Sequence, residues 1–190
     1  MAGAQKTIQM AEIALMGAVL CVVSPFAVPV PASPVPLSLA TFAVYLAAVL
    51  LGAKRGAVSV LVYLLLGMVG LPVFSGFSGG IGVLLGPTGG YLMGYVPCAL
   101  VVGRLAEEKC FGRLFGSGKR FLKNTFAMAL GTLVCYVFGT AWFLFVMKGS
   151  YTVSQALLVC VVPYLAFDLM KILAAAAVAE PVKRILRNRE

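Results

Sequence analysis

The sequence contains no histidine and few charged residues, and each shortage narrows the range of possible functions. Without histidine, imidazole acid–base catalysis and histidine-ligated metal sites are excluded. The five cysteines form no Cys-x-x-Cys pair and most lie in apolar runs, which is typical of small core residues rather than of a redox or metal centre. Charged residues occupy only 11% of the 190 positions, against about a quarter in soluble domains.

Apolar residues take the place of the missing charges. They make up 62% of the chain, and the mean hydropathy is +1.04. A chain of this length cannot hide so much apolar surface in the core of one globule. The same composition excludes a disordered chain, a fibrous protein and a disulfide scaffold. We therefore predict an integral membrane protein.

Six apolar segments predict an all-α membrane protein with six transmembrane helices, forming a single domain over residues 1–190. The second and third segments have about 15–16 residues, fewer than the roughly 20 that cross a typical bilayer. They can span only by using flanking residues or by thinning the bilayer locally. The expected helices cover about 8–27, 37–51, 56–70, 89–105, 121–146 and 163–186.

Prolines divide the chain at two places. Four prolines in the linker 28–36 prevent a helix there and favour extended backbone. The last apolar stretch, 153–179, is too long for one simple span and contains Pro163, a residue well tolerated in the first turn of a helix. We therefore expect a short outer helix at 153–161 and a sixth span that begins at Pro163. Glu12 interrupts the first segment and no cleavage site follows it, so this segment is interpreted as a retained helix.

The basic residues separate by side when six helices are assumed. Thirteen of the 15 then lie on one side, Lys148 lies on the other, and Lys171 falls within the sixth segment. A count of five or seven helices removes this separation. The positive-inside rule places both termini in the cytoplasm and the proline- and glycine-rich loops outside. The net charge of +9 is thus explained by topology and the lipid bilayer, without a nucleic-acid partner.

Asp168 and Lys171 are the charged pair that topology does not explain. A spacing of three places both side chains on one face of a helix, one turn apart. A charge at the bilayer centre costs about 2.5–3.5 kcal/mol on insertion scales, so ionisable residues in a span indicate a functional site. An acceptor and a cation together suit a ligand with N–H donors and an anionic group. The alternative is an internal ion pair that fixes helix packing.

A glycine-dense stretch between the third and fourth segments provides a second candidate for the ligand site. Glycine permits positive φ and close approach of the backbone, so bare amides and carbonyls can face a ligand. Irregular backbone at membrane depth is tolerated where it is buried in protein or lines a cavity. The alternative is a tight external turn without a ligand role. The candidate residues are Ser78, Gly79, Gly80, Gly86, Pro87, Thr88, Gly89, Gly90 and Tyr91.

Ala14 and Ala18 form a small-xxx-small pattern in the first segment. Small residues at this spacing allow another helix to approach closely. Ordinary packing within the bundle explains the pattern equally, because Ala43 with Ala47 and Ala127 with Gly131 have the same spacing. A helix of a partner protein is the functional alternative.

Four motifs in order resemble the BioY family, the biotin-binding S component of energy-coupling factor (ECF) transporters. The motifs are Pro34-Val35-Pro36, Gly67 to Phe74, Gly86-Pro87-Thr88-Gly89-Gly90-Tyr91 and Asp168-Leu169-Met170-Lys171. The resemblance covers nearly the whole chain, and the second half of this set is its specific part.

The resemblance implies a six-helix fold with a biotin pocket on the extracellular side, closed by the loops between helices 1–2 and 3–4. It implies that Asp168 accepts from the ureido N–H groups and that Lys171 meets a ligand oxygen. Some relatives use an asparagine in the 3–4 loop and an arginine near helix 4. This chain has Ser78 in that loop and no arginine between Arg55 and Arg104.

The resemblance also implies partners. Ala14 and Ala18 would contact the transmembrane T component, and two separate ATPase subunits would hydrolyse ATP. The chain itself would need no cofactor and no metal, and it would not be an enzyme. The protein is expected in the prokaryotic plasma membrane, as a multi-pass cell-membrane protein. Two alternatives are a small intramembrane enzyme acting on a lipid or isoprenoid substrate, and a self-sufficient vitamin carrier.

Overall fold

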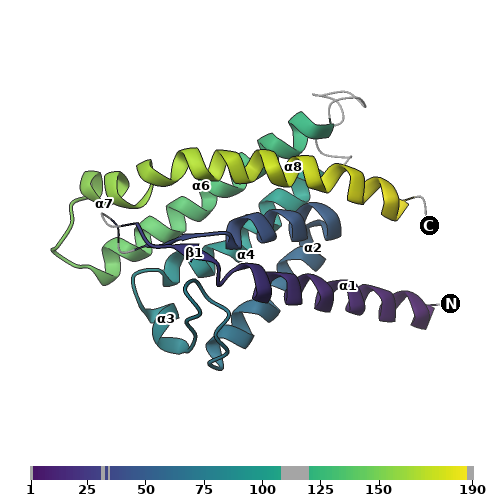
Figure 1. Ribbon diagram of the computed structural model, residues 1–190, viewed down its shortest axis with the longest axis horizontal. Coiled ribbons are helices and arrows are strands. Elements are labelled where there is room, and N and C mark those ends of the chain that lie inside the picture. Colours follow the sequence, from purple (N-terminus) through teal and green to yellow (C-terminus); the bar gives the residue numbers. More distant parts are fainter. Residues whose placement is uncertain (1, 31–32, 34, 108–119, 188–190) are drawn as a thin grey trace.

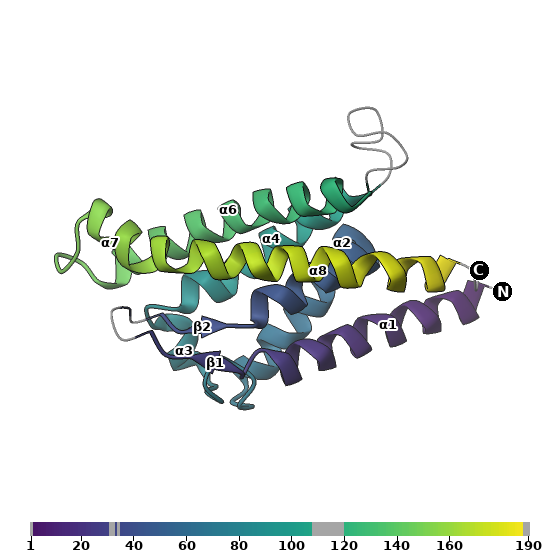
Figure 2. The same ribbon diagram turned by 45° about the horizontal axis from the view of Figure 1, so that its top comes forward.

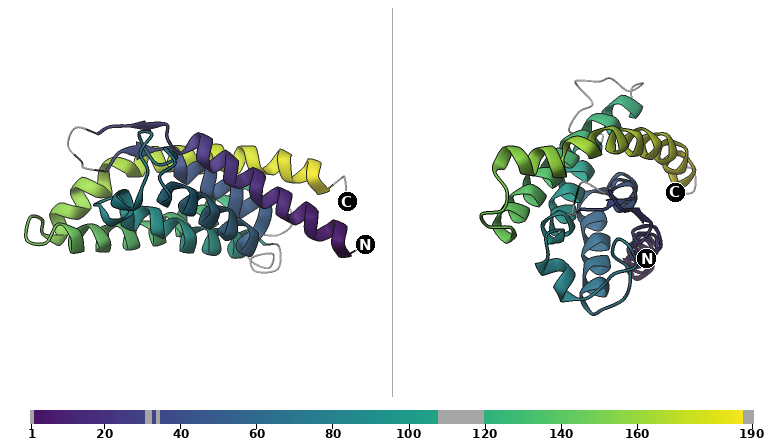
Figure 3. Two further views of the ribbon diagram at one scale, coloured as in Figure 1. Left: turned by 90° about the horizontal axis from the view of Figure 1, so that it is seen from below. Right: turned by 60° about the vertical axis from the view of Figure 1, so that its left-hand side comes forward.

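The computed structural model describes residues 2–30, 33, 35–107 and 120–187. Its long helices lie roughly along one axis, and the first helix, α1 (Ala2–Val23), begins at the same end of the molecule at which the last, α8 (Leu165–Arg187), finishes (Figures 1 and 3). The short elements gather at the opposite end (Figure 2): β1 (Ala27–Val28), β2 (Leu37–Ser38), α3 (Ile81–Leu85) and α7 (Val153–Cys160). The basic residues Lys109, Arg113, Lys119 and Arg189, all assigned to the cytoplasmic side, lie outside the described residues.

The first helix and the proline-rich linker differ slightly from the expected bounds. Helix α1 covers Ala2–Val23 and ends before Ser24-Pro25, rather than near residue 27. Beyond it, β1 (Ala27–Val28) pairs antiparallel with β2 (Leu37–Ser38). Pro29 and Pro36 directly flank the two strands, and because proline has no N–H for a helix interior, the residues beside them pair as strands instead of continuing the helices. The next helix, α2, therefore begins at Ala40 and not at Leu37.

Helix α2 (Ala40–Met68) contains the second and third predicted spans, which meet at Gly52. Gly52 has φ 80° and ψ 178°, a conformation outside the helical region that glycine adopts without strain. The two halves, 40–51 and 53–68, pack closely against each other, because a Cβ on Gly56 would lie 2.8 Å from Cα of Ala48. Small residues thus allow a tight helical hairpin where the sequence predicted two short helices.

Four of the remaining helices follow the predicted segments, and α3 is an additional short helix within the glycine-dense stretch, which the sequence did not predict. They are α3 (Ile81–Leu85), α4 (Gly89–Ala106), α6 (Arg120–Val146), α7 (Val153–Cys160) and α8 (Leu165–Arg187). Pro163 lies in a separate 3-10 turn, η1 (Val162–Tyr164), two residues before the start of α8 and not inside its first turn. A capping box between Thr152 and Gln155 starts α7. Helix α4 packs against both α2 and α6 and is the most buried of the long apolar helices that are described.

Five described stretches are long and apolar enough to cross a membrane, and one of them is the α2 hairpin. Counting its two halves separately gives the six helices of the prediction. The Gly52 turn lies at the end of the molecule where the chain begins, since Arg55 next to it forms an ion pair of 2.7 Å with Glu12 of α1. Lys123 donates to the backbone oxygen of Glu107 at the same end. The positive-inside rule makes this end cytoplasmic and the opposite end extracellular.

Candidate functional site

A cavity of about 240 Å³ lies inside the helix bundle, towards the extracellular end. Among the described elements, β2, α2, α3, α4, α6, α7, η1 and α8 each contribute a side chain to its wall, and α1 contributes none. The cavity is therefore enclosed by elements far apart in the sequence. Its lining is mixed, with apolar residues such as Val35, Phe74, Val83 and Leu92 beside many hydroxyl groups.

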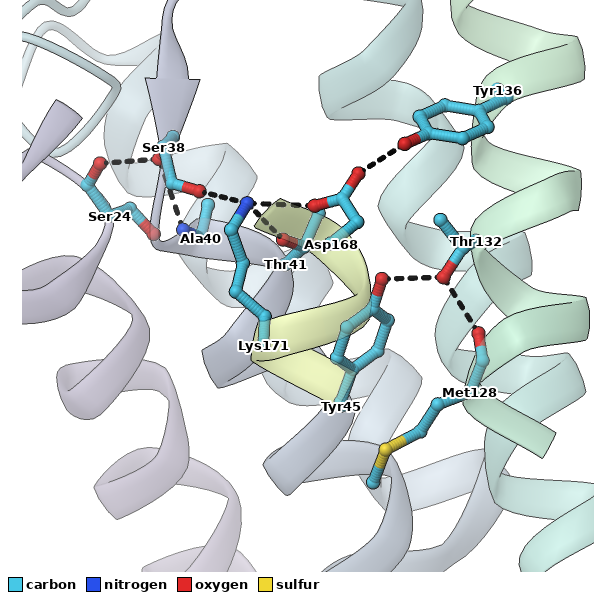
Figure 4. A network of polar contacts seen from close by, with 10 residues as sticks. All are labelled: Ser24, Ser38, Ala40, Thr41, Tyr45, Met128, Thr132, Tyr136, Asp168 and Lys171. Carbon is cyan, nitrogen blue, oxygen red and sulfur yellow. Dashed lines mark hydrogen bonds and ion pairs between the residues drawn. The ribbon is translucent and has the colours of Figure 1, made fainter. Parts of the chain in front are cut away.

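Asp168 and Lys171 line this cavity from the first two turns of α8. Their side chains are 8% and 9% exposed, and Lys171 Nζ lies 2.8 Å from Asp168 Oδ1. Two ionised groups so deeply buried need further partners to offset the loss of hydration. Lys171 has two more acceptors, the backbone oxygen of Ser38 at 2.8 Å and Oγ1 of Thr41 at 3.2 Å (Figure 4).

Tyr136 of α6 supplies the second partner of Asp168. Its hydroxyl donates to Oδ2, while Oδ1 is the oxygen shared with Lys171 (Figure 4). One turn earlier on α6, Thr132 also lines the cavity and pairs with the buried hydroxyl of Tyr45 at 2.6 Å. The charged pair is thus held from one side by α6 and from the other by β2 and the start of α2.

The glycine-rich segment divides into residues that face the cavity and residues that serve packing. Ser78, Thr88 and Tyr91 line the cavity. The other predicted ligand residues, Gly79, Gly80, Gly86, Pro87, Gly89 and Gly90, do not line it. Their environment explains the glycines: a Cβ on Gly89 would lie 1.7 Å from the oxygen of Leu84.

Gly90 and Gly86 show the same packing role at the junction of α4 and α6. A Cβ on Gly90 would lie 2.1 Å from Cβ of Trp142, so glycine lets the two helices meet. Gly86 presents its backbone oxygen to Nε1 of Trp142 at 3.0 Å. The glycines therefore shape the wall of the cavity without contributing to its surface.

Ala14 and Ala18 lie on the exposed face of α1. The opposite face, with Met16, Gly17 and Leu20 buried, packs on the α2 hairpin. Packing within the described bundle therefore does not account for the small-xxx-small pattern. A partner helix stays the prediction for this face.

Several cavity residues carried no recognisable signal in the sequence. Thr41, Thr132 and Tyr136 are single polar residues inside apolar helices, and Tyr95, Cys135, Cys160 and Tyr164 belong to the same wall. Tyr164 also donates its hydroxyl to the backbone oxygen of Val35, which ties η1 to the proline-rich linker. The i, i+4 spacing of Thr132 and Tyr136 indicates a shared helix face but not what that face contacts.

Comparisons with known proteins agree with this architecture. The solved S-component for biotin from an ECF-type ABC transporter superimposes with a TM-score of 0.83, covering 97% of this chain and 95% of that one at 24% identity. At that identity the likeness establishes the fold.

Similar sequences come from bacteria and archaea. The biotin transporter BioY of Thermotoga maritima is 40% identical over 157 residues, which are 82% of this chain and 85% of that protein. The probable biotin transporter BioY of Pyrococcus horikoshii is 37% identical over 148 residues, 77% of this chain and 80% of that one. The family model described as BioY family matches residues 1–188. The chain belongs to the BioY family.

Proposed function

We propose that this chain is the biotin-binding membrane subunit of an ECF-type vitamin transporter and captures biotin from the extracellular side. The observation that carries the proposal is the buried Asp168–Lys171 pair, 2.8 Å apart, in the wall of a cavity inside the helix bundle. A carboxylate beside an ammonium group matches a cyclic urea, which presents an N–H donor next to a carbonyl oxygen. Relatives of this chain are named biotin transporters.

The geometry favours one orientation of biotin. The ureido group and the valerate carboxylate lie at opposite ends of the molecule, separated by the fused rings and the alkyl chain. Asp168 and Lys171 are too close together to serve both ends. We therefore assign both to the ureido head, with Asp168 accepting from N–H and Lys171 donating to the carbonyl oxygen. Among the described cavity residues no second cation is present, so hydroxyls such as Ser75, Ser78 and Thr88 remain for the carboxylate.

The size of the cavity supports a vitamin over a lipid substrate. Its volume of about 240 Å³ lies below the roughly 300–1,000 Å³ of pockets for drug-sized ligands. A ligand as compact as biotin suits this space, whereas a long lipid chain does not. Relatives named as transporters give no support to the enzyme alternative. We expect the chain to bind no cofactor.

Binding of radiolabelled biotin to the purified protein tests this function. Asp168→Asn and Lys171→Ala are expected to weaken binding by at least tenfold, because each removes a hydrogen bond to a charged group worth about 1.5–3 kcal/mol. Glu12→Gln is the matched control, since it breaks an ion pair with Arg55 that lies at the cytoplasmic end and outside the cavity. A wild-type protein that does not retain biotin would refute the proposal.

Transport itself requires partners, and we assign their contact to α1. The exposed Ala14 and Ala18 offer a flat surface to a helix of the T component, and two ATPase subunits would supply the energy. Ala14→Trp and Ala18→Trp should abolish copurification of these subunits and leave biotin binding intact. Leu133→Trp, at an exposed position of α6, is the control. If liposomes containing this chain alone accumulate biotin, it is a self-sufficient carrier instead.

A further inference from the structure

The two carboxylate oxygens of Asp168 have different partners. Oδ1 faces Lys171 Nζ at 2.8 Å, and Oδ2 accepts the hydroxyl of Tyr136. Asp168 and Tyr136 belong to α8 and α6, and both line the cavity (Figure 4). Tyr136 is outside the motifs that marked the ligand site in the sequence, yet it is the group in direct contact with the acidic member of the pair.

The contact fixes a side chain that is otherwise free to rotate. The terminal torsion of an aspartate has a broad, roughly two-fold distribution, so its two oxygens exchange positions easily. A hydrogen bond to an ionised acceptor is about twice as strong as one between neutral groups. Tyr136 therefore holds the carboxylate in one orientation, with Oδ2 towards its hydroxyl and Oδ1 towards Lys171.

We propose that Tyr136 is a positioning residue that sets the ligand selectivity of this site, an inference that rests on the proposed biotin-binding function. In this orientation Asp168 accepts an N–H group of the ligand at the side of Oδ1, and Lys171 donates to the atom beside it. A cyclic urea satisfies both. A cyclic guanidinium offers two parallel N–H donors, which require both oxygens of a carboxylate, and its positive charge faces Lys171. The Tyr136 hydroxyl competes with such a fork for Oδ2 and thus disfavours the paired contact that would favour the guanidinium.

The test compares two ligands that differ at this head. Biotin carries the urea, and 2-iminobiotin carries the corresponding guanidine, which is protonated at pH 7. We expect the wild type to prefer biotin by at least about a hundredfold, the loss of one or two charged hydrogen bonds. Tyr136→Phe removes the hydroxyl alone, weakens biotin binding by about tenfold and reduces the preference by a similar factor, because Oδ2 becomes available to the guanidinium.

A control variant, and the ratio of the affinities for biotin and 2-iminobiotin, distinguish positioning from a merely structural role of Tyr136. Tyr45→Phe also removes a buried tyrosine hydroxyl, but Tyr45 pairs with Thr132 and does not line the cavity. It should leave the preference unchanged. A Tyr136→Phe variant that loses affinity for both ligands equally, or that keeps the wild-type preference, overturns the inference. A wild type that binds both ligands equally well overturns it without any variant. Failure of the wild type to bind biotin refutes the proposed function itself.

Discussion

Replacing Lys171 by methionine removes one charge of the buried pair and keeps most of the side-chain volume. Asp168 would then remain 8% exposed with one neutral donor, the hydroxyl of Tyr136. Removing one partner of a buried ion pair costs about 3–5 kcal/mol, because the other charge is left uncompensated. Since 1 kcal/mol corresponds to about 2–4 °C for chains of this size, the melting temperature should fall by about 6 °C or more.

The opposite variant, Asp168→Asn, should cost less. Lys171 keeps the backbone oxygen of Ser38 and Oγ1 of Thr41 as acceptors. The double variant combines Asp168→Asn with Lys171→Met. It leaves neither charge of the pair in the cavity wall, and the asparagine still offers an oxygen to Tyr136. Replacing both members of a buried ion pair by neutral residues is often close to neutral for stability. The double variant should therefore melt at a higher temperature than Lys171→Met and still fail to bind biotin.

Thermal unfolding of the purified variants in one detergent, followed by intrinsic fluorescence, measures these differences, and radiolabelled biotin binding is measured in parallel. Two results would contradict the reasoning. One is a Lys171→Met protein that melts at the wild-type temperature, which would mean that the pair carries no buried charge. The other is a double variant that melts lower than Lys171→Met, because the two losses would then add instead of compensating.

Two further predictions concern the wall of the cavity. Gly67→Ala should weaken biotin binding, because its Cβ would lie 2.1 Å from Cζ of the lining residue Phe74; Gly82→Ala, whose Cβ meets nothing within 4 Å, should bind as the wild type does. Trp142→Phe keeps an aromatic ring but loses the 3.0 Å hydrogen bond to Gly86, which is worth about 1 kcal/mol. Hydrogen–deuterium exchange around α3 should therefore become faster, while exchange in α8 stays unchanged.

The long helices were predictable because their signal is local. Within the bilayer an apolar segment must satisfy its backbone hydrogen bonds internally, which a helix does, and prolines indicate where the helix ends. The errors fall where pairing with a distant segment decides the structure. Leu37 and Ser38 were assigned to a helix by their apolar neighbours, but Ser38 lies opposite Ala27 in a two-stranded sheet. No pattern within residues 37–51 predicts that pairing.

The site was only partly predictable for the same reason. Asp168 and Lys171 are conspicuous because charge is costly in a span, whereas Tyr136 and Thr41 are unremarkable in their own helices and gain meaning only from the pair they contact. Glycines are conspicuous in the sequence, but a glycine is compatible with ligand contact and with close helix packing alike. Gly90 is explained by Trp142, a residue of another helix, and no local pattern distinguishes that role from contact with a ligand.

The partners of the charged pair also determine which part of the cavity supplies affinity and which supplies selectivity. Lys171 and Asp168 already make hydrogen bonds to each other, to Ser38 and to Tyr136. A ligand's polar head therefore largely exchanges its hydrogen bonds with water for hydrogen bonds with groups that already have partners. Such an exchange contributes little net free energy. Burial of apolar rings at about 25 cal/mol per Å² is not offset in this way, and Phe74, Val83 and Leu92 supply the surface for it. Removing one of these polar groups is nevertheless costly, because the ligand's polar head is then buried without a partner. Polar substitutions should therefore lower the affinity for biotin and change which ligand is chosen, whereas apolar substitutions should change how tightly any ligand is held.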